Sequence, residues 1–307
     1  MTRSRPKSAP ARAAESAEGS RRIANAIQEQ QRVLSAVAAL DTAGVEDVHR
    51  TRVAARRLRS VLKTFGPLLE SRRARLYRVD LRSYARALAG VREADVRREL
   101  LAAIAGQDTS VPPAERKRLD LLLEDACIGA REALRRHRSE PGWAALCGAL
   151  TRHAANEALI VEHKASLARV LSMVALAWRK PVRLLKVEPD SADELHELRL
   201  ALKHCRYALE PVADVAPKAT ARLLRRLRGA QDAIGEHRDL MLAEHWLRSN
   251  ERQLGRELSA QLVSDLQRRE RQLRRLAARR SRKVYEAYSV WRAATRRLTR
   301  ETKPGRE

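Results

Sequence analysis

The sequence predicts an all-α protein. The strong helix formers Ala, Leu, Arg and Glu dominate it, and alternating runs of β-branched residues are nearly absent. Its 12 glycines and 11 prolines fall mainly between the apolar-periodic segments, where such residues end helices. The chain has 307 residues, of which 44% are hydrophobic, so it is long enough for one large domain or two ordinary ones with a sizeable core.

The elements expected in the first half follow from apolar periodicity and from these breaks. Residues 1–20 are basic and lack an apolar period, and we expect them to form a disordered tail. The Ser-Glu-Pro-Gly segment at 139–142 closes the last helix of this half. The helices expected here span residues 22–40, 46–65, 72–105 with a break near Gly90, and 114–138.

The second half gives a similar pattern. Ser191 or Asp193 is suited to cap the helix that starts near residue 192. The last helix is the longest, and residues 301–307 after it are expected to fray. The helices expected here span residues 143–179, 192–210, 218–234, 237–249 and 257–298.

An internal repeat is the most informative feature of the sequence. Residues 49–59 are HRTRVAARRLR and residues 196–206 are HELRLALKHCR, so both match H-x-x-R-x-x-x-[RK]-[RH]-x-R. An arginine followed by an acidic residue comes 43 positions after the first histidine, at Arg92, and 42 after the second, at Arg238. Two matches in the same order predict a duplicated helical unit, with one repeat at about 21–140 and the other at about 141–300.

Each copy predicts a helix with a cationic face and an apolar back. At about 100° per residue, the histidine and the basic residues three, seven and ten positions later fall on one narrow stripe. Leucine and alanine side chains lie on the opposite side, where they anchor the helix in a bundle. The stripes comprise His49, Arg52, Arg56, Arg59 and Lys63 in the first copy, and His196, Arg199, Lys203 and Arg206 in the second.

Two interpretations of these stripes remain open. A run of cations on a helix is often only a solvated face, and a histidine is often a cap or a core residue. The matched spacing of both copies, with no acidic residue inside either stripe, favours an anion-binding surface instead. Arg82 and Arg228 belong to further basic series, at 75–86 and 222–228, that extend this surface or are solvated; the basic residues at 274–283 are expected to be solvated.

Composition and charge exclude several classes. Lys and Arg number 63 against 38 acidic residues, giving a net charge of +25, so we expect an anionic partner. No apolar run is long enough for a transmembrane helix, and we expect no signal peptide because residues 1–20 lack an apolar core. Cys127, Cys147 and Cys205 are odd in number and widely spaced, so we expect neither a disulfide framework nor a zinc site, and a reducing cytoplasm is the simplest compartment.

Four segments resemble the CHAD family, the conserved histidine α-helical domain. They are VHRTRVAARRLRSVLKTFGPLL (48–69), LAGVREADV (88–96), LHELRLALKHCRYALE (195–210) and IGEHRDL (234–240), so the resemblance spans about residues 21–300. It implies two pseudo-symmetric four-helix bundles that face a basic central channel. It also implies binding of inorganic polyphosphate, with association to polyphosphate granules in some members.

The resemblance implies contacts at the matching positions, although some positions depart from the pattern. Glu93 stands where Asp is usual, Ala89 where the second copy has Gly235, and His204 where the first copy has Arg57. The family's fused triphosphate-tunnel domain has no counterpart here, since we find no E-x-E-x-K strand, which indicates a stand-alone form. The implied contacts are His49, Arg52, Arg56, Arg57, Arg59 and Arg92 in the first copy, and His196, Arg199, Lys203, His204, Arg206 and Arg238 in the second.

Three functions are compatible with these sequence features. The leading one is non-catalytic binding of polyphosphate, which needs no metal and no cofactor, since paired Arg, Lys and His stripes suit a repeating anion without bases. Non-specific binding to the backbone of DNA or RNA is the alternative; the charge permits it, but only 3% of residues are aromatic and no nucleic-acid-binding module is recognisable. A phosphohydrolase is the third, with Asp95 and Asp239 as the acidic residues near the stripes.

Overall fold

The computed structural model describes residues 17–38, 45–108, 110–154 and 159–300. These residues confirm the all-α prediction, and the isolated bridge between Leu69 and Ile160 is the extended pairing found among them. The α-helices are α2 (Glu18–Ala38), α3 (Val45–Thr64), α4 (Ser71–Ala87), α5 (Ala89–Gln107), α6 (Pro113–Ser139), α7 (Pro141–Ala154), α8 (Leu167–Ala177), α9 (Arg179–Leu184), α10 (Ala192–Leu209), α11 (Pro217–Ser249), α12 (Glu251–Leu254) and α13 (Arg256–Arg300).

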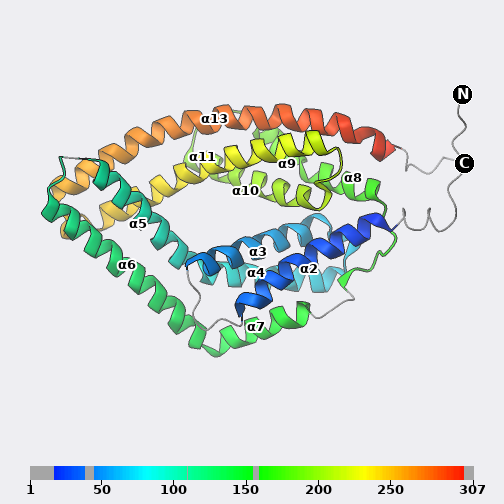
Figure 1. The fold of residues 1–307 in the computed structure, drawn as a ribbon, viewed down its shortest axis with the longest axis horizontal. Coiled ribbons are helices and arrows are strands. Elements are labelled where there is room, and N and C mark those ends of the chain that lie inside the picture. Colours follow the sequence, from blue (N-terminus) through cyan, green and yellow to red (C-terminus); the bar gives the residue numbers. More distant parts are fainter. Residues whose placement is uncertain (1–16, 39–44, 109, 155–158, 301–307) are drawn as a thin grey trace, which may run out of the picture.

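The helices form two groups that meet at α3 and α10. In the first group α3 packs between α2 and α4, and in the second α11 packs against both α10 and α13. Figure 1 shows α13 along the top of the molecule, α6 along the lower left and α7 at the bottom, with α3 and α10 near the middle. The described helices therefore place the two repeated segments, which lie on α3 and α10, beside each other; their arrangement as two pseudo-symmetric four-helix bundles stays a prediction.

Two hydrophobic cores hold this arrangement. The larger core includes residues of both halves, from Ile23 on α2 to Trp291 on α13, and Trp178 and Trp291 are fully buried in it. A second core joins the C-terminal part of α5 to α6, α12 and the adjoining ends of α11 and α13, with Leu119 and Leu262 fully buried. Because the larger core is common to both halves, burial of apolar surface fixes α3 relative to α10.

The N-terminal boundary differs from the prediction. Residues 1–16 and 301–307, expected as a disordered tail and a frayed end, lie outside the described residues. Helix α2 nevertheless begins at Glu18, so the expectation of disorder to residue 20 is wrong for its last residues. The buried hydroxyl of Ser20 donates to the carbonyl of Glu162 at 2.5 Å and accepts from the amide of Ala165 at 3.0 Å, which docks this end of the helix.

Of three interior stretches of the chain, one is interrupted as the sequence predicts and two differ from the prediction. The predicted break near Gly90 is confirmed, because α4 ends at Ala87 and α5 begins at Ala89. The single helix expected over 143–179 is wrong: α7 ends at Ala154, and the chain pairs at Ile160 before Ser166 caps α8. The break expected between 234 and 237 is also wrong, because α11 is continuous there.

No helix among the described residues is both long and apolar enough to cross a membrane.

Candidate functional site

A basic cavity of about 270 Å³ lies where helices of both halves meet. Helices α3 and α5 line it from the first half, and α10 and α11 line it from the second. The sequence-predicted residues that line it are His49, Arg52, Arg56, Arg92, Arg199, Lys203 and Arg238. The structure thus brings residues of both stripes to one cavity. Arg92 and Arg238, which follow the repeat histidines by 43 and 42 positions, line the same cavity. We call it the central cavity.

The first-half wall is built on Arg52 and Arg56. A guanidinium nitrogen of Arg52 donates to the carbonyl of Ala85 at 3.2 Å, an oxygen next to the break between α4 and α5. Arg56 donates from Nε to the carbonyl of Arg52 at 3.3 Å, one turn earlier on the same helix. Burial, and after it the charge of Arg56, lower the pKa of Arg52 to about 10. These bonds leave other donors of both guanidinium groups available to a ligand.

The second-half wall is built on Arg199. Its guanidinium packs on the backbone of α11 at Gly235, where an added Cβ would lie 3.5 Å from Nη2. Its Nε is buried and has no hydrogen-bond partner among the described residues. Burial lowers the pKa of Arg199, and Asp239 opposes that shift. A buried unpaired donor is costly, and an anionic oxygen in the cavity would satisfy it.

Lys203 on α10 lines the cavity together with Arg56 on α3. Burial, and after it the charges of Arg199 and Arg56, lower its pKa to about 6, while Asp239 acts in the opposite direction. Its ammonium form is therefore disfavoured mainly because it loses water, and secondly because cations from both halves surround it. The negative charge of a bound polyanion would offset both penalties.

The two repeat histidines have matching surroundings. Burial lowers the pKa of His49, and the charge of Arg92 on α5 makes the next largest contribution in the same direction. Burial likewise lowers the pKa of His196, followed by the charge of Arg238 on α11. His196 does not itself line the central cavity, although Arg238 does. Each histidine thus lies close to the arginine that the sequence spacing paired with it.

The cavity also holds two carboxylates and one arginine outside the predicted contact set. Glu93 and Asp239 line it, and burial raises the pKa of Asp239 although Arg199 and Arg92 oppose the shift. Arg97 lines it too, with its guanidinium carbon 5.1 Å from the centre of the Trp246 ring. Arg97 follows Glu93 by one helical turn, and that spacing is a signal from which the sequence analysis could have selected it.

Asp95 is placed elsewhere. It is buried between α5 and α6, where Arg131 donates to its Oδ1 at 2.7 Å. It does not line the central cavity, so of the two acidic residues considered for catalysis only Asp239 reaches it. No group of three or more His, Cys, Asp or Glu residues suited to hold a metal ion occurs in the described part of the chain.

Three predicted contacts converge instead on Glu210, just after α10. Arg57 lies 3.2 Å from its carboxylate and Arg206 lies 3.9 Å from it. Both guanidinium groups also lie over the ring of Tyr207, at 5.9 and 4.8 Å. Burial raises the pKa of Glu210, while Arg57, Arg206 and more distantly Arg228 oppose that shift. The structure therefore places Arg57, Arg206 and Arg228 around an acidic residue rather than in the central cavity.

The remaining predicted residues lie beyond the cavity near the C-terminal end of α3. Arg59 lies within electrostatic reach of Arg82 on α4; burial lowers its pKa first, and Arg82 next. His204 has its Nε2 3.3 Å from the hydroxyl of Thr64, and burial, then Lys63, lowers its pKa to about 4. His204 is therefore neutral at neutral pH, so it does not replace the charge of Arg57.

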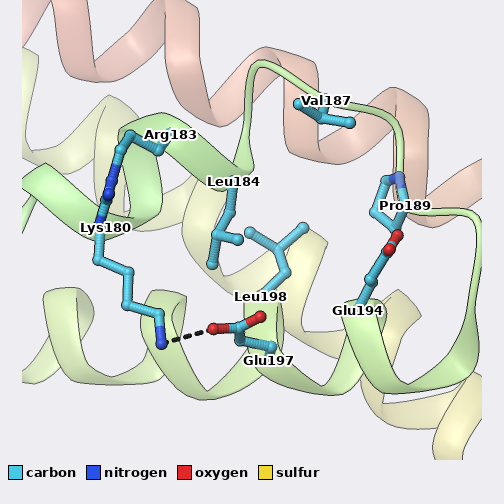
Figure 2. Close-up of a pocket in the computed structure, with 8 residues that line it drawn as sticks. All are labelled: Lys180, Arg183, Leu184, Val187, Pro189, Glu194, Glu197 and Leu198. Atoms are coloured by element: carbon cyan, nitrogen blue, oxygen red, sulfur yellow. Dashed lines mark ion pairs between the residues drawn. The ribbon is translucent and has the colours of Figure 1, made fainter.

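A second pocket, between α9 and α10, has a different character. Figure 2 shows Lys180 reaching across it to Glu197, whose carboxylate lies 2.6 Å from the ammonium. Glu194 is held by the amide of Asp190, which donates to it at 2.8 Å. Leu184 and Val187 supply an apolar wall. Because two carboxylates, Glu194 and Glu197, offset the two cations that line it, Lys180 and Arg183, this pocket offers little to an anion.

Comparison with known proteins identifies the family. The model of the CHAD domain matches residues 23–248, so the chain belongs to the CHAD family. PptA from Streptomyces chartreusis has a similar structure, with a TM-score of 0.62 and 19% identity, covering 90% of this chain and 98% of that one. The CHAD domain from the plant Ricinus communis matches with a TM-score of 0.57 and 22% identity, covering 94% and 91%.

These two similarities concern the fold, since both identities are low. No curated protein shows significant sequence similarity to the chain.

Proposed function

We propose that the protein binds inorganic polyphosphate in the central cavity and does not transform it. One observation supports this most: seven Arg and Lys side chains from four helices of both halves line one cavity with only two acidic residues. Guanidinium groups match phosphate oxygens with paired donors, and a polymer of phosphates engages many of them at once. Membership of the CHAD family supports the same class of ligand.

The proposal of binding without catalysis rests on what the acidic side chains do. Glu93 opposes the lowering of the pKa of Arg52, and Asp239 does the same for Arg199. Both carboxylates thus stabilise the charge of the cations beside them. The proposed location is the cytoplasm, with recruitment to polyphosphate granules through the bound polymer.

The decisive experiment reverses charge on both sides of the cavity. Arg56→Glu with Lys203→Glu should abolish binding of long-chain polyphosphate, measured by calorimetry, because two cations become anions where the halves meet. Circular dichroism and thermal melting should remain close to wild type, since both side chains are only partly buried. The matched control is Arg252→Glu with Arg256→Glu, two exposed arginines away from the cavity, which should bind normally.

Two results would contradict the proposal. The first is duplex DNA or tRNA displacing polyphosphate at matched phosphate concentration in physiological salt, which would favour nucleic acid as the ligand. The second is release of orthophosphate by purified protein that the double variant abolishes, which would make the protein an enzyme.

A further inference from the structure

We propose a second polyanion-binding site in a groove between α11 and α13, separate from the central cavity. The groove encloses about 570 Å³. Six basic side chains line it against a single acidic one, Glu286. They are Arg225, Arg226, Arg279, Arg280, Arg282 and Lys283.

The groove is separated from the central cavity by α11 itself. At about 100° per residue, Arg225, Arg226 and Gly229 lie within one arc of about 100°, whereas Arg238 projects from roughly the opposite side of the helix. The two sites have no lining residue in common. Arg280 crosses between the helices and donates to the carbonyl of Gly229 at 2.9 Å, which fixes the floor of the groove.

Most of the groove cations form no ion pair with the residues that the structure describes. Arg282 forms an ion pair with Glu188 at 2.7 Å, and the guanidinium of Arg280 donates to the backbone carbonyl of Gly229. Arg225, Arg226, Arg279 and Lys283 are exposed, and none of them forms an ion pair with a described residue. Like charges this close destabilise one another, and Arg279 and Lys283 are also one turn apart on α13. A ligand with several negative charges relieves that repulsion at all four positions.

The chemistry of the lining favours a phosphate polymer without bases. No aromatic side chain is among the described residues that line the groove, whereas single-stranded nucleic acid gains much of its affinity by stacking on rings. The arginines supply forked donors for phosphate oxygens. The identity of the ligand rests on the proposed function, so the groove is a second site for the same polyphosphate. A long chain engaging both sites gains affinity through effective concentration.

Calorimetry with a short-chain polyphosphate tests the groove directly. Wild type should show two binding events, and Arg225→Glu with Arg279→Glu should lose the weaker one and keep the tighter one. For long-chain polyphosphate the same variant should bind about tenfold more weakly than wild type, because the second attachment is lost. Arg252→Glu with Arg256→Glu is the charge-matched control and should match wild type. If the groove variant melts early, Arg226→Glu with Lys283→Glu replaces it.

The outcomes separate this inference from the proposed function. A groove variant that binds both chain lengths like the control overturns the groove, while loss of the tighter event in Arg56→Glu with Lys203→Glu still supports the central cavity. The opposite pattern, with loss only in the groove variant, supports the groove and overturns the cavity. Displacement of polyphosphate from the double cavity variant by duplex DNA at matched phosphate concentration overturns polyphosphate as the groove ligand.

Discussion

Lys203 is the residue whose charge depends most directly on whether the cavity is filled. Its pKa of about 6 makes it mostly neutral at neutral pH in the ligand-free protein. A polyanion beside it favours the ammonium form, so binding above pH 6 takes up a proton. His49 and His196, whose pKa values are also lowered, respond in the same direction at lower pH.

We therefore expect affinity for polyphosphate to weaken as pH rises from 6 to 8, by up to about tenfold per pH unit if Lys203 must be charged. Calorimetry in buffers of different ionisation enthalpy should show proton uptake on binding at pH 8. Lys203→Arg stays charged and should remove most of that uptake. Affinity that does not change over this pH range would contradict the assignment.

The lowered pKa of Lys203 also affects the stability of the ligand-free protein. Between pH 6 and pH 10.5 the unfolded chain holds a proton on Lys203 that the folded protein lacks. The free energy of unfolding should therefore rise with pH across this window. Lys203→Met should flatten the rise, as chemical denaturation at several pH values would show.

Asp239 should limit the affinity of the central cavity. It lies among Arg199, Arg92 and Lys203, and burial raises its pKa. Removing its charge with Asp239→Asn takes away one repulsion of about 1 kcal/mol toward bound phosphate, so affinity should rise about fivefold at low salt. The ligand-free protein should melt at a lower temperature, because Arg199 loses its counter-charge. Asp232→Asn, at an exposed position of α11, is the control and should change neither measurement.

Helical periodicity predicted which residues share a face, but not which neighbour each turn meets. His196 and Arg206 lie about 15 Å apart along the axis of α10, so the two ends of this stripe meet different neighbours. The last turn therefore meets Glu210 instead of the cavity. Arg57 lies off the stripe altogether, and only the family resemblance selected it. Local sequence carries no information about a partner that packing brings from another helix.

At the scale of the helices, the sequence predicted one interruption correctly and another wrongly. The break between α4 and α5 was predicted from Gly90, and the carbonyl of Ala85 beside that break accepts from Arg52. A break was also expected between 234 and 237, where Gly235 lies, yet α11 continues through it. A glycine inside a helix costs only about 1 kcal/mol, and packing of Arg199 against its bare backbone favours continuity.

No local sequence feature indicated the interruption after α7, because backbone hydrogen bonds to a segment far away in the sequence cause it. The amide of Glu70 donates to the carbonyl of Leu159 at 2.9 Å, and the amide of Val161 donates to the carbonyl of Leu68 at 3.0 Å. These bonds hold the segment extended beside the end of α3. The apolar period of 143–179 suits a helix, so only the tertiary contact decides against it.

The start of α2 gives a test of close helix docking. A Cβ on Gly19 would collide with the carbonyl oxygens of Ala165 and Ser166, which are backbone atoms that cannot rotate away. Gly19→Ala should therefore lower the free energy of unfolding by about 1–3 kcal/mol, measured by chemical denaturation. Gly129→Ala on α6, where an added Cβ meets open space, should instead raise it by about 0.5–1 kcal/mol. Equal effects of the two substitutions would contradict the docking.

At the scale of the whole molecule, the same two repeat positions lie close together twice between α3 and α10, with the roles of the two halves exchanged. Arg57 meets Glu210, while His204 meets Lys63. Positions 57 and 204 are 147 apart, and so are positions 63 and 210. A twofold relation between the repeats would produce this exchange. The sequence departure at His204 places a neutral imidazole, rather than a second arginine, beside the cation of the partner helix.

The net charge of +25 attracts any polyanion, so salt dependence must distinguish a built site from a diffuse field. Each neutralised phosphate of a flexible single chain contributes about −0.7 to the slope of log affinity against log salt. Seven Arg and Lys side chains line the central cavity. For a short chain that fills only this cavity we therefore expect a slope of about −5.

Variants decide whether that slope belongs to the cavity. Arg52→Gln or Arg238→Gln should each make the slope shallower by about 0.7, because one fewer counterion is released from the chain. Arg252→Gln removes an equal charge from an exposed position outside the cavity and should leave the slope unchanged, because screening beyond about 10 Å is nearly complete at 0.1 M salt. Binding measured between low and physiological salt gives all four slopes. If Arg252→Gln shifts the slope as much as Arg52→Gln does, the polyanion is held by overall charge rather than by the cavity between the repeats.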